Sequence, residues 1–302
     1  MTMLRGLFVS TFSILTVLAG NVAKAEPQLQ VELRPSSPKL GESMVVEIDP
    51  PGNLSPEEAQ RLTVNFTKSG TSQPVSYPAF PIDAAGDRYR ALIPTSPLDQ
   101  HGRTLLQISD GIETRNLAVW VQSRSFPTQR ITIRGAASKG ATQYELDRAA
   151  EFKKLVTPVK YWSGKLLRPS SGRISTVFGV RRYYNGVFAQ DYYHRGIDYA
   201  AGYGSPVIAP AAGKIALIDY ESNGFRVHGN TVGIDHGQGV LSILIHLNSI
   251  SSNLKEGDFV QAGQQIGTVG STGASTGPHL HWGLYVNGVA IDPVPWRSQA
   301  ID

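Results

Sequence analysis

The sequence predicts an all-β protein of two domains, and three observations lead to this prediction. The chain of 302 residues is long enough for two domains that each have a core. It contains 31 Gly and 19 Pro but only 17% charged residues, a composition that favours strands and turns over helical bundles. Short apolar runs alternate with turn signals along most of its length. We therefore expect an N-terminal β-sandwich of the immunoglobulin-like type, a short linking helix and a C-terminal antiparallel β domain.

The first 25 residues have the form of a signal peptide that is removed after export. Arg5 supplies a positive charge, residues 7–19 are mostly apolar, and Ala23-Lys24-Ala25 has the small-x-small form of a cleavage site. We expect cleavage after Ala25, no membrane segment after cleavage, and a location in the periplasm or the cell wall. An uncleaved anchor is the alternative, because the uncharged residues 6–22 approach the minimum length for crossing a bilayer. The cleavage site favours the first interpretation.

Residues 26–123 are expected to form the sandwich as an accessory domain. Short apolar runs in this region are separated by turn signals rich in Gly, Pro, Asn and Asp. We find no catalytic group of residues here and interpret the domain as a binding or regulatory module. The predicted strands are residues 29–33, 44–48, 62–66, 89–93, 105–108 and 117–121.

Residues 124–160 are expected to connect the two domains and to contain one helix. Thr142 can cap the N-terminus of this helix, and Glu145, three residues later, would complete a capping box. Apolar residues then recur at helical spacing until Pro158, before which the helix ends. We interpret the helix as a packing element or spacer.

Residues 161–302 are expected to form the antiparallel β domain. Asn287-Gly288 is typical of a tight hairpin turn, and no segment has the length and periodicity of a convincing helix. The predicted strands are residues 214–218, 230–235, 239–247, 265–269 and 279–286.

Four histidines and one aspartate of this domain are candidate site residues. His279 and His281 are two residues apart in a predicted strand, so both imidazoles point to the same face. His194 and Asp198 flank a tight turn, and His246 lies alone in an apolar run, where a histidine is more often a hydrogen-bonded core residue. Each pattern is weak alone. Together, in one β domain, they indicate a metal site with catalytic neighbours.

Zinc is the metal that these residue types suggest. It binds about four N, S or O ligands, and a catalytic site leaves one position for water. The chain has no cysteine, so His and Asp must supply the ligands. His194, Asp198 and His281 could hold one Zn²⁺ ion, which would make water more acidic and polarise an amide. His279 and His246 could take and deliver protons, since a neutral imidazole suits general base work near pH 7.

At these residues the chain resembles the lysostaphin-like (LytM-type) family of zinc peptidoglycan endopeptidases. The resemblance covers roughly residues 164–295, and the less specific N-terminal region is similar to a β module that precedes this domain in some exported members. It implies zinc on His194, Asp198 and His281, catalytic assistance from His246 and His279, and a groove for an extended peptide. The motifs that carry it include Phe178-Gly179, His194-x-x-x-Asp198, His246-Leu247, Gly270-x-Thr-Gly273 and His279-x-His281.

The leading hypothesis is therefore an exported zinc endopeptidase that hydrolyses amide bonds in peptidoglycan stem peptides or cross-links. Both a D,D cross-link and a glycine-type bridge fit these residues, and we favour the D,D bond. The alternative function is a non-catalytic wall-binding activator of another hydrolase. In relatives of that kind the metal ligands are typically replaced, whereas all five residues are present here. A purely structural zinc ranks last, because such sites use four protein ligands and a fourth is not evident.

Other polar residues and the net charge carry less information. The net charge of +4 suits an anionic wall polymer, but no Lys/Arg cluster indicates a nucleic-acid partner, and nothing indicates an oligomeric state. We expect His236 to be structural and His228 to be exposed to solvent. For the loop residues Arg181, Tyr183 and Asn230, substrate contact and loop support are both open, and loop support is favoured.

Overall fold

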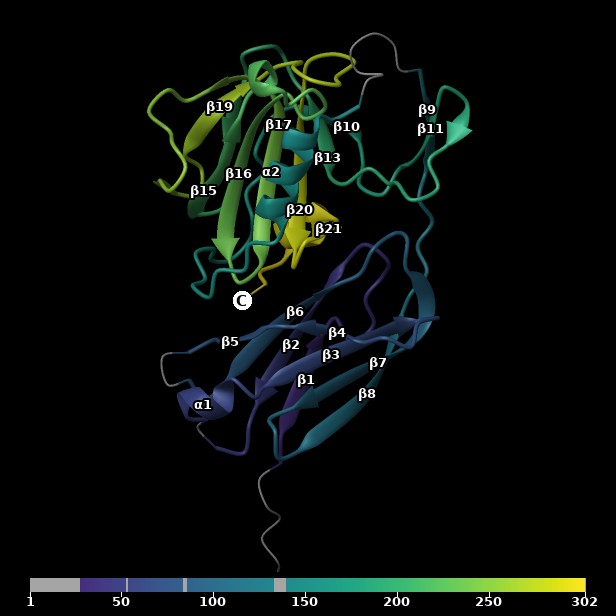
Figure 1. Ribbon diagram of the computed structural model, residues 1–302, viewed down its shortest axis with the longest axis vertical. Helices are drawn as coiled ribbons and strands as arrows, with labels where there is room; N and C mark the ends of the chain where they lie inside the picture. Colours follow the sequence, from purple (N-terminus) through teal and green to yellow (C-terminus); the bar gives the residue numbers. More distant parts are fainter. Residues whose placement is uncertain (1–27, 53, 84–85, 133–139, 302) are drawn as a thin grey trace, which may run out of the picture.

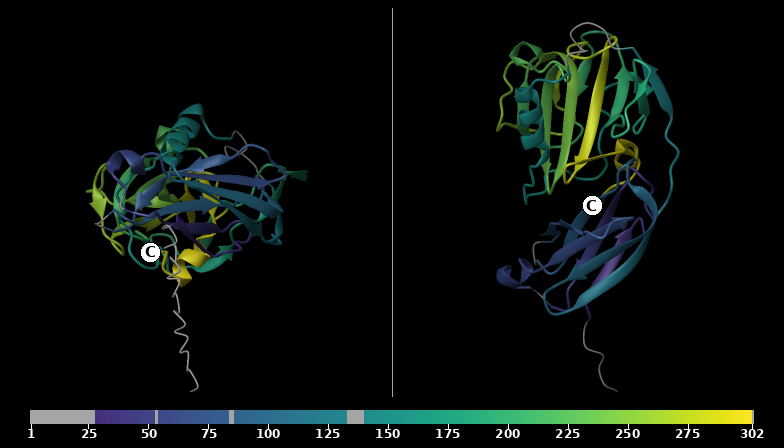
Figure 2. Two further views of the ribbon diagram at one scale, coloured as in Figure 1. Left: turned by 90° about the horizontal axis from the view of Figure 1, so that it is seen from below. Right: turned by 45° about the vertical axis from the view of Figure 1, so that its right-hand side comes forward.

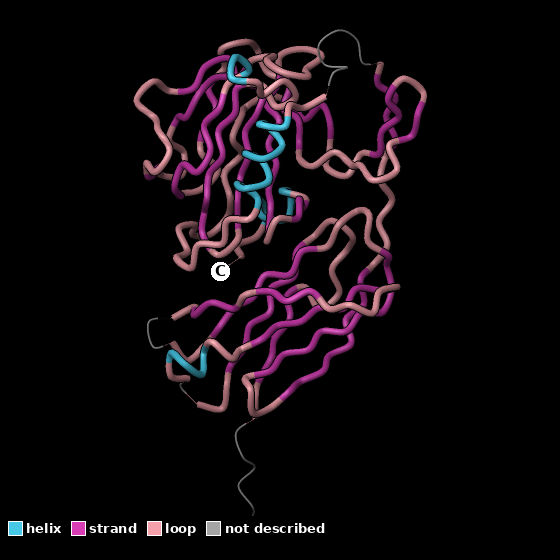
Figure 3. The backbone as a smooth tube through the Cα atoms, in the orientation of Figure 1, coloured by secondary structure: helices cyan, strands magenta, loops and turns pink. Residues whose placement is uncertain are grey.

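The computed structural model describes residues 28–52, 54–83, 86–132 and 140–301, and within them the chain is predominantly β-structure. Figure 1 shows two β regions, the N-terminal one below and the C-terminal one above, joined by a segment along one side. The helices are few and short (Figure 3), and none of those in the described residues has the length and apolar character needed to cross a membrane. The predicted all-β fold class is confirmed. The expected signal peptide, residues 1–25, lies outside the described residues.

The N-terminal region is a β-sandwich. Its elements are β1 (Gln30–Arg34), β2 (Ser43–Asp49), α1 (Pro56–Ala59), β3 (Thr63–Ser69), β4 (Val75–Tyr77), β5 (Ala79–Pro81), β6 (Tyr89–Pro94), β7 (Gln100–Ser109) and β8 (Thr114–Val121). One sheet has the strand order β1-β2-β6-β5 and the other β4-β3-β7-β8, and side chains from both fill one hydrophobic core. Strands β4 and β5 have only three residues each. They carry too little pattern to be predicted from the sequence.

Strand β2 contributes to a hydrophobic core on each of its two faces. Met44, Val46 and Ile48 point into the sandwich core. Val45, between them, belongs instead to the core of the C-terminal region, together with Leu92 of β6. The outer face of this sheet therefore packs against the C-terminal region.

The connecting segment contributes β9 (Thr128–Ile131) and α2 (Gln143–Lys153). The helix begins as predicted, with the Thr142 hydroxyl accepting from the Glu145 N–H at 3.1 Å. The predicted capping box is wrong, because the Glu145 carboxylate is 0% exposed and bonds to residues of another loop. Helix α2 lies against one face of the large C-terminal sheet (Figures 1 and 2), with Phe152 packed over Gly233.

The C-terminal region contains a ten-stranded sheet. Its elements are β10 (Arg173–Thr176), β11 (Arg181–Tyr184), β12 (Val187–Phe188), β13 (Ile197–Ala200), β14 (Pro206–Ile208), β15 (Gly213–Asp219), η2 (Glu221–Asn223), β16 (Asn230–Gly237), β17 (Val240–Ile250), β18 (Phe259–Val260), β19 (Gln265–Val269), β20 (His279–Val286), β21 (Val289–Ile291) and α3 (Pro293–Ser298). The sheet has the main order β10-β13-β20-β17-β16-β15-β18, and its strand pairs are antiparallel, as predicted. A smaller sheet, β12-β11-β9, includes the strand from the connecting segment, which pairs with β11 in parallel.

The sandwich contacts the end of the large sheet where β20 finishes (Figure 1). At this contact the Trp296 indole N–H donates to Ser43 Oγ at 3.0 Å, and Asn287 Nδ2 donates to the Leu92 carbonyl at 2.7 Å. The Arg124 guanidinium forms an ion pair with Asp292 at 2.6 Å. His279, at the other end of β20, is seven residues from Val286, which corresponds to about 23 Å of strand.

Candidate metal centre

Strand pairing brings Asp198 and His281 together. Strand β13 lies antiparallel to β20, Asp198 stands opposite His281, and Asp198 Oδ1 is 2.8 Å from His281 Nδ1. His194 precedes β13 and is separated from it by a bend at Gly196, where a Cβ would lie 2.3 Å from the Trp282 carbonyl oxygen. This close approach directs His194 Nε2 to 2.9 Å from Asp198 Oδ1 and 3.0 Å from His281 Nδ1. His194, Asp198 and His281 are all buried.

The three converging atoms have the chemistry of metal ligands. His194 Nδ1 lies 2.8 Å from the Val177 carbonyl oxygen, which can only accept, so Nδ1 carries the proton and Nε2 of the neutral ring carries a lone pair. If His281 Nδ1 carries a proton, it can donate this proton to either Asp198 Oδ1 or His194 Nε2. These two atoms are both acceptors and lie 2.9 Å apart, so their contact is repulsive. A cation between the three atoms relieves this repulsion, and an N, O, N donor set suits zinc. The described residues contain one such group of three, His194, Asp198 and His281.

His246 and His279 lie beside these three residues. The ring centroid of His246 is 4.7 Å from that of His279 and 6.4 Å from that of His281. The Nδ1–H of His246 donates to the Thr272 carbonyl and that of His279 to the Gly277 carbonyl, each at 2.8 Å. In the neutral form of each ring Nε2 would therefore carry the lone pair, and His279 Nε2 is 4.0 Å from Asp198 Oδ1. The structure thus brings all five predicted residues into one cluster.

Protonation at this centre suits a cation. Burial raises the pKa of Asp198, but the hydrogen bonds and charges of His194 and His281 outweigh burial and hold its pKa far below the usual range. Burial lowers the pKa of His281 to about 4, despite the attraction of Asp198. Burial and the neighbouring histidines lower the pKa of His246 well below 6.5. Near pH 7 the carboxylate is charged and these two imidazoles are neutral, which are the forms that bind a metal.

Arg181 and Asn230, which were expected in loops, are the first residues of strands β11 and β16, and their contacts favour structural support over substrate contact. Arg181 donates from Nε to the Tyr192 carbonyl at 2.9 Å. The Asn230 side chain accepts from the Glu221 N–H at 3.1 Å and donates to the Asn248 carbonyl at 3.3 Å. Both side chains thus fasten neighbouring backbone segments.

The two remaining histidines of this region lie in different environments. His236 is 0% exposed and bonds to the Ala212 carbonyl at 2.8 Å and to Ser242 Oγ at 2.9 Å, as expected for a structural residue. The expectation that His228 is exposed is wrong. Its side chain is 22% exposed, and its Nδ1 lies 2.6 Å from the Glu145 carboxylate. Sequence reasoning missed this pair because Glu145 matched a capping pattern and its partner lies 83 residues away.

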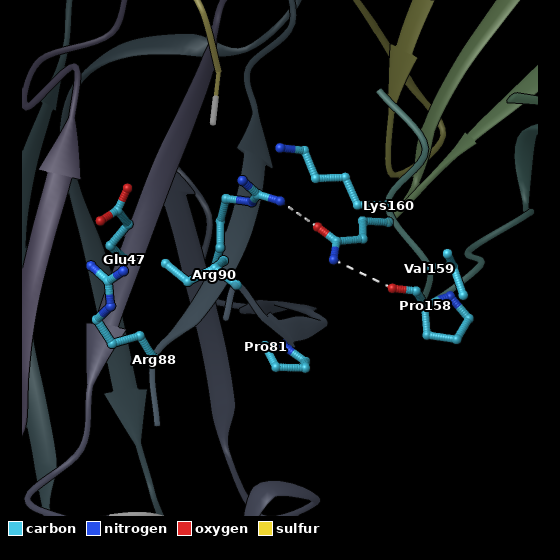
Figure 4. Close-up of a pocket in the computed structure, with 9 residues that line it drawn as sticks. Glu47, Pro81, Arg88, Arg90, Pro158, Val159 and Lys160 are labelled. Atoms are coloured by element: carbon cyan, nitrogen blue, oxygen red, sulfur yellow. Dashed lines mark hydrogen bonds between the residues drawn. The ribbon is translucent and has the colours of Figure 1, made fainter. Parts of the chain in front are cut away.

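A pocket of about 490 Å³ lies between the sandwich and the C-terminal region (Figure 4). Arg88 and Arg90 line it from the sandwich, and Pro158, Val159 and Lys160 line it from the end of the connecting segment. Arg90 donates to the Gln238 side chain at 2.6 Å, which joins the two regions. None of the five residues of the metal centre lines this pocket.

Comparisons with known proteins agree with this geometry. The model of "Peptidase family M23" matches residues 192–293. An uncharacterized metalloprotease of Haemophilus influenzae is 30% identical over 189 residues, which are 63% of this chain and 33% of that protein. The DD-carboxypeptidase/endopeptidase Mpg of Neisseria meningitidis is 40% identical over 140 residues, which are 43% of this chain and 30% of that protein. The chain thus spans about a third of the length of these curated relatives.

A solved structure resembles nearly the whole chain. It is the crystal structure of a candidate peptidase M23 from Pseudomonas aeruginosa, with a TM-score of 0.59 and 25% sequence identity. The match covers 86% of this chain and 94% of that one, so the likeness includes the N-terminal β region.

Proposed function

Because the C-terminal part of this chain belongs to peptidase family M23, we propose that the protein is a zinc metalloendopeptidase that hydrolyses amide bonds in peptidoglycan stem peptides or cross-links. The observation that carries the proposal is the convergence of His194 Nε2, Asp198 Oδ1 and His281 Nδ1 within 3.0 Å of one another. These three residues would hold one zinc ion. The chemistry that zinc supplies at such a site is Lewis acidity, which polarises an amide carbonyl and makes water more acidic.

The chain's own residues supply the proton transfers in this proposal. The Nδ1–H groups of His246 and His279 are fixed by backbone carbonyls, so each Nε2 is oriented and free to accept a proton from water. Burial lowers the pKa of His246 and keeps the ring neutral near pH 7, the form that can accept a proton from water, and the protonated ring can then deliver this proton to the leaving amine. Removing either ring would slow the reaction, by about 10²–10⁴-fold if it acts as a general acid or base.

The substrate class is inferred from the relatives. The Neisseria protein is named a DD-carboxypeptidase/endopeptidase, and a Vibrio cholerae relative, 38% identical over 121 residues, is named a peptidoglycan DD-endopeptidase. We favour a D,D bond over a glycine-type bridge, because these two relatives match over more residues than a glycyl-glycine endopeptidase of Staphylococcus capitis, which is 39% identical over 112 residues. Action on peptidoglycan would place the protein in the periplasm or the cell wall, after removal of residues 1–25.

The experiment uses residues 26–302 and purified peptidoglycan sacculi. Soluble fragments are followed with zinc, with a chelator, and with His281→Ala. The matched control is His101→Ala, which removes an exposed imidazole of the sandwich. We expect zinc-dependent release that the His281→Ala variant loses and the His101→Ala variant keeps. Mass spectra of the fragments identify the bond.

Zinc binding without release of fragments would contradict the proposal. It would instead favour a non-catalytic module that activates another wall hydrolase. Release that continues in the chelator and in His281→Ala would contradict the assignment of the metal ligands.

A further inference from the structure

Helix α2 of the connecting segment carries a buried carboxylate that no step of the proposed reaction uses. Glu145 is 0% exposed and accepts hydrogen bonds from three donor groups of one loop. Glu145 Oε1 lies 2.7 Å from the His228 N–H, 2.6 Å from His228 Nδ1 and 3.1 Å from the Val227 N–H. Burial raises the pKa of Glu145, but the bonds and charge of His228 outweigh it and lower the pKa, so the group is ionised. A buried ionised group that accepts hydrogen bonds from three donor groups fixes its partners firmly.

The loop that Glu145 holds is in direct contact with His246. The His246 backbone N–H donates to the His228 carbonyl at 2.9 Å, and the Ala274 N–H donates to the Val227 carbonyl at 3.0 Å. The second of these bonds attaches the loop that contains Thr272. The Thr272 carbonyl accepts the His246 Nδ1–H. The backbone hydrogen bond of His246 and its side-chain hydrogen bond therefore both depend on residues 227–229.

The two loops are packed too closely for either to move alone. A Cβ on Gly229 would lie 2.4 Å from Thr272 Oγ1, and a Cβ on Gly273 would lie 2.4 Å from the Gly229 nitrogen. Thr272 Oγ1 also accepts from the Asn230 N–H at 3.0 Å. A displacement of the loop at His228 would therefore be transmitted to Thr272.

His246 needs such support because its backbone is strained. Its φ of +64° lies in the left-handed region, which costs a non-glycine residue about 1–2 kcal/mol. Strained conformations of this kind persist only where the surrounding structure fixes them. The surrounding structure here is the pair of loops attached to Glu145.

We propose that Glu145 is a positioning residue of the active site, which acts through His228 and residues 227–229 to hold His246 in its strained, proton-accepting orientation. The inference rests on the proposed function for the role of His246. It makes the connecting segment a part of the active-site support. Glu145 touches neither substrate nor metal in this proposal.

The variants needed for a test should fold, because other contacts fasten α2. Phe152 is 2% exposed in the core. The Tyr144 hydroxyl donates to Asp219 at 2.9 Å, and the Thr142 hydroxyl donates to the Gly224 carbonyl at 2.9 Å. Glu151, exposed on the same helix, provides the matched control.

The experiment compares wild type, Glu145→Gln, Glu145→Ala and Glu151→Ala in the full mature chain. The first readout is amide hydrogen exchange at His246 followed by NMR, with Leu280 of β20 as the internal reference. We expect exchange at His246 to be at least tenfold faster in Glu145→Ala, less accelerated in Glu145→Gln, which keeps one acceptor oxygen, and unchanged in Glu151→Ala. Leu280 should not change.

The second readout is peptidoglycan hydrolysis. We expect kcat to fall about tenfold in Glu145→Ala, with KM and zinc affinity unchanged, because the metal ligands lie on other elements. In a His246→Ala background the Glu145→Ala change should have no further effect on any residual rate.

Unchanged exchange at His246 in Glu145→Ala would overturn the inference, as would equal acceleration at Leu280, which would indicate general destabilisation. If the wild-type protein hydrolyses nothing, the proposed function fails. The exchange measurement still decides whether Glu145 holds His246.

Discussion

The histidines of the C-terminal region differ in the surroundings of the ring nitrogen Nε2. His194, His246 and His279 each donate Nδ1–H to a backbone carbonyl, which leaves Nε2 directed at the metal centre. In His236 both nitrogens have partners inside the core, a carbonyl and a hydroxyl. A histidine whose Nε2 is available can bind a ligand or a proton, as the proposed reaction requires. A histidine whose two ring nitrogens are both hydrogen-bonded in the core, such as His236, contributes to stability instead.

His236 should make the stability of the protein depend on pH. Burial lowers its pKa from 6.5 to about 4 in the folded state. Between these values the unfolded chain binds more protons, so the free energy of unfolding falls as the pH decreases. Above pH 6.5 the protonation of His236 does not reduce the free energy of unfolding. Towards pH 4 this free energy falls progressively, by about 2 kcal/mol at pH 5.

The measurement is urea unfolding of wild type and His236→Gln at several pH values between 7 and 4.5, with chelator present. We expect the wild type to lose about 2 kcal/mol more than the variant on going from pH 7 to pH 5. Parallel pH profiles would show that His236 does not titrate in this way.

The five residues that cluster at the candidate metal centre could be selected from the sequence, but part of their geometry could not. Alternation in a strand places His279 and His281 on one face whatever the surrounding fold. The left-handed backbone of His246 follows from contacts with loops distant in the sequence. The role of Glu145 was hidden for the same reason, since a local capping pattern gives no information on a long-range partner.

How well a single strand or helix could be predicted depended on the regular spacing of its apolar residues. Strands β19 and β20 have the predicted bounds, and α2 begins at the predicted cap. Strands β9 and β11 were not predicted, because Thr-Gln-Arg-Ile and Arg-Arg-Tyr-Tyr have no clear alternation of apolar and polar residues. Their pairing with each other, and not an intrinsic pattern, defines them.

Helix α2 should contribute strongly to stability through one side chain. Phe152 is 2% exposed and packs over Gly233, where a Cβ would lie 2.7 Å from its ring. We expect Phe152→Ala to lower the free energy of unfolding by about 3–5 kcal/mol, because it removes a buried ring and leaves a cavity.

The control on the same helix is Leu146→Ala, at a side chain that is 51% exposed, which should change the free energy of unfolding by less than about 0.5 kcal/mol. Urea unfolding measures both variants. A loss below about 1 kcal/mol in Phe152→Ala would show that α2 does not anchor the sheet.

At the scale of the whole molecule, the sandwich and the metal centre lie at opposite ends of β20. The sandwich meets the end near Val286 and Asn287, whereas the connecting segment contacts the C-terminal region through Glu145, which accepts from His228, and through β9 beside β11. The connecting segment is therefore more closely integrated with the C-terminal region than a spacer would be.

Truncation separates these contributions. A chain of residues 124–302 keeps β9 and α2, and we expect it to bind zinc with nearly the affinity of the full chain. A chain of residues 161–302 lacks Phe152 and Glu145, and we expect it to be unfolded or to bind zinc at least tenfold more weakly. Calorimetric titration with zinc and circular dichroism test both. Equal zinc binding by the two chains would contradict the structural role given to the connecting segment.

The distance along the chain between the proposed metal ligands also determines when the candidate centre can form. His194 and His281 are 87 residues apart in the sequence. Domains generally fold as units, and N-terminal ones first, so the sandwich can fold before β20 has found its partners. The three ligands meet only after β20 has paired with β13 and β17. The proposed hydrolytic activity therefore requires these strand pairings, and a chain in which β20 is unpaired would hydrolyse no substrate.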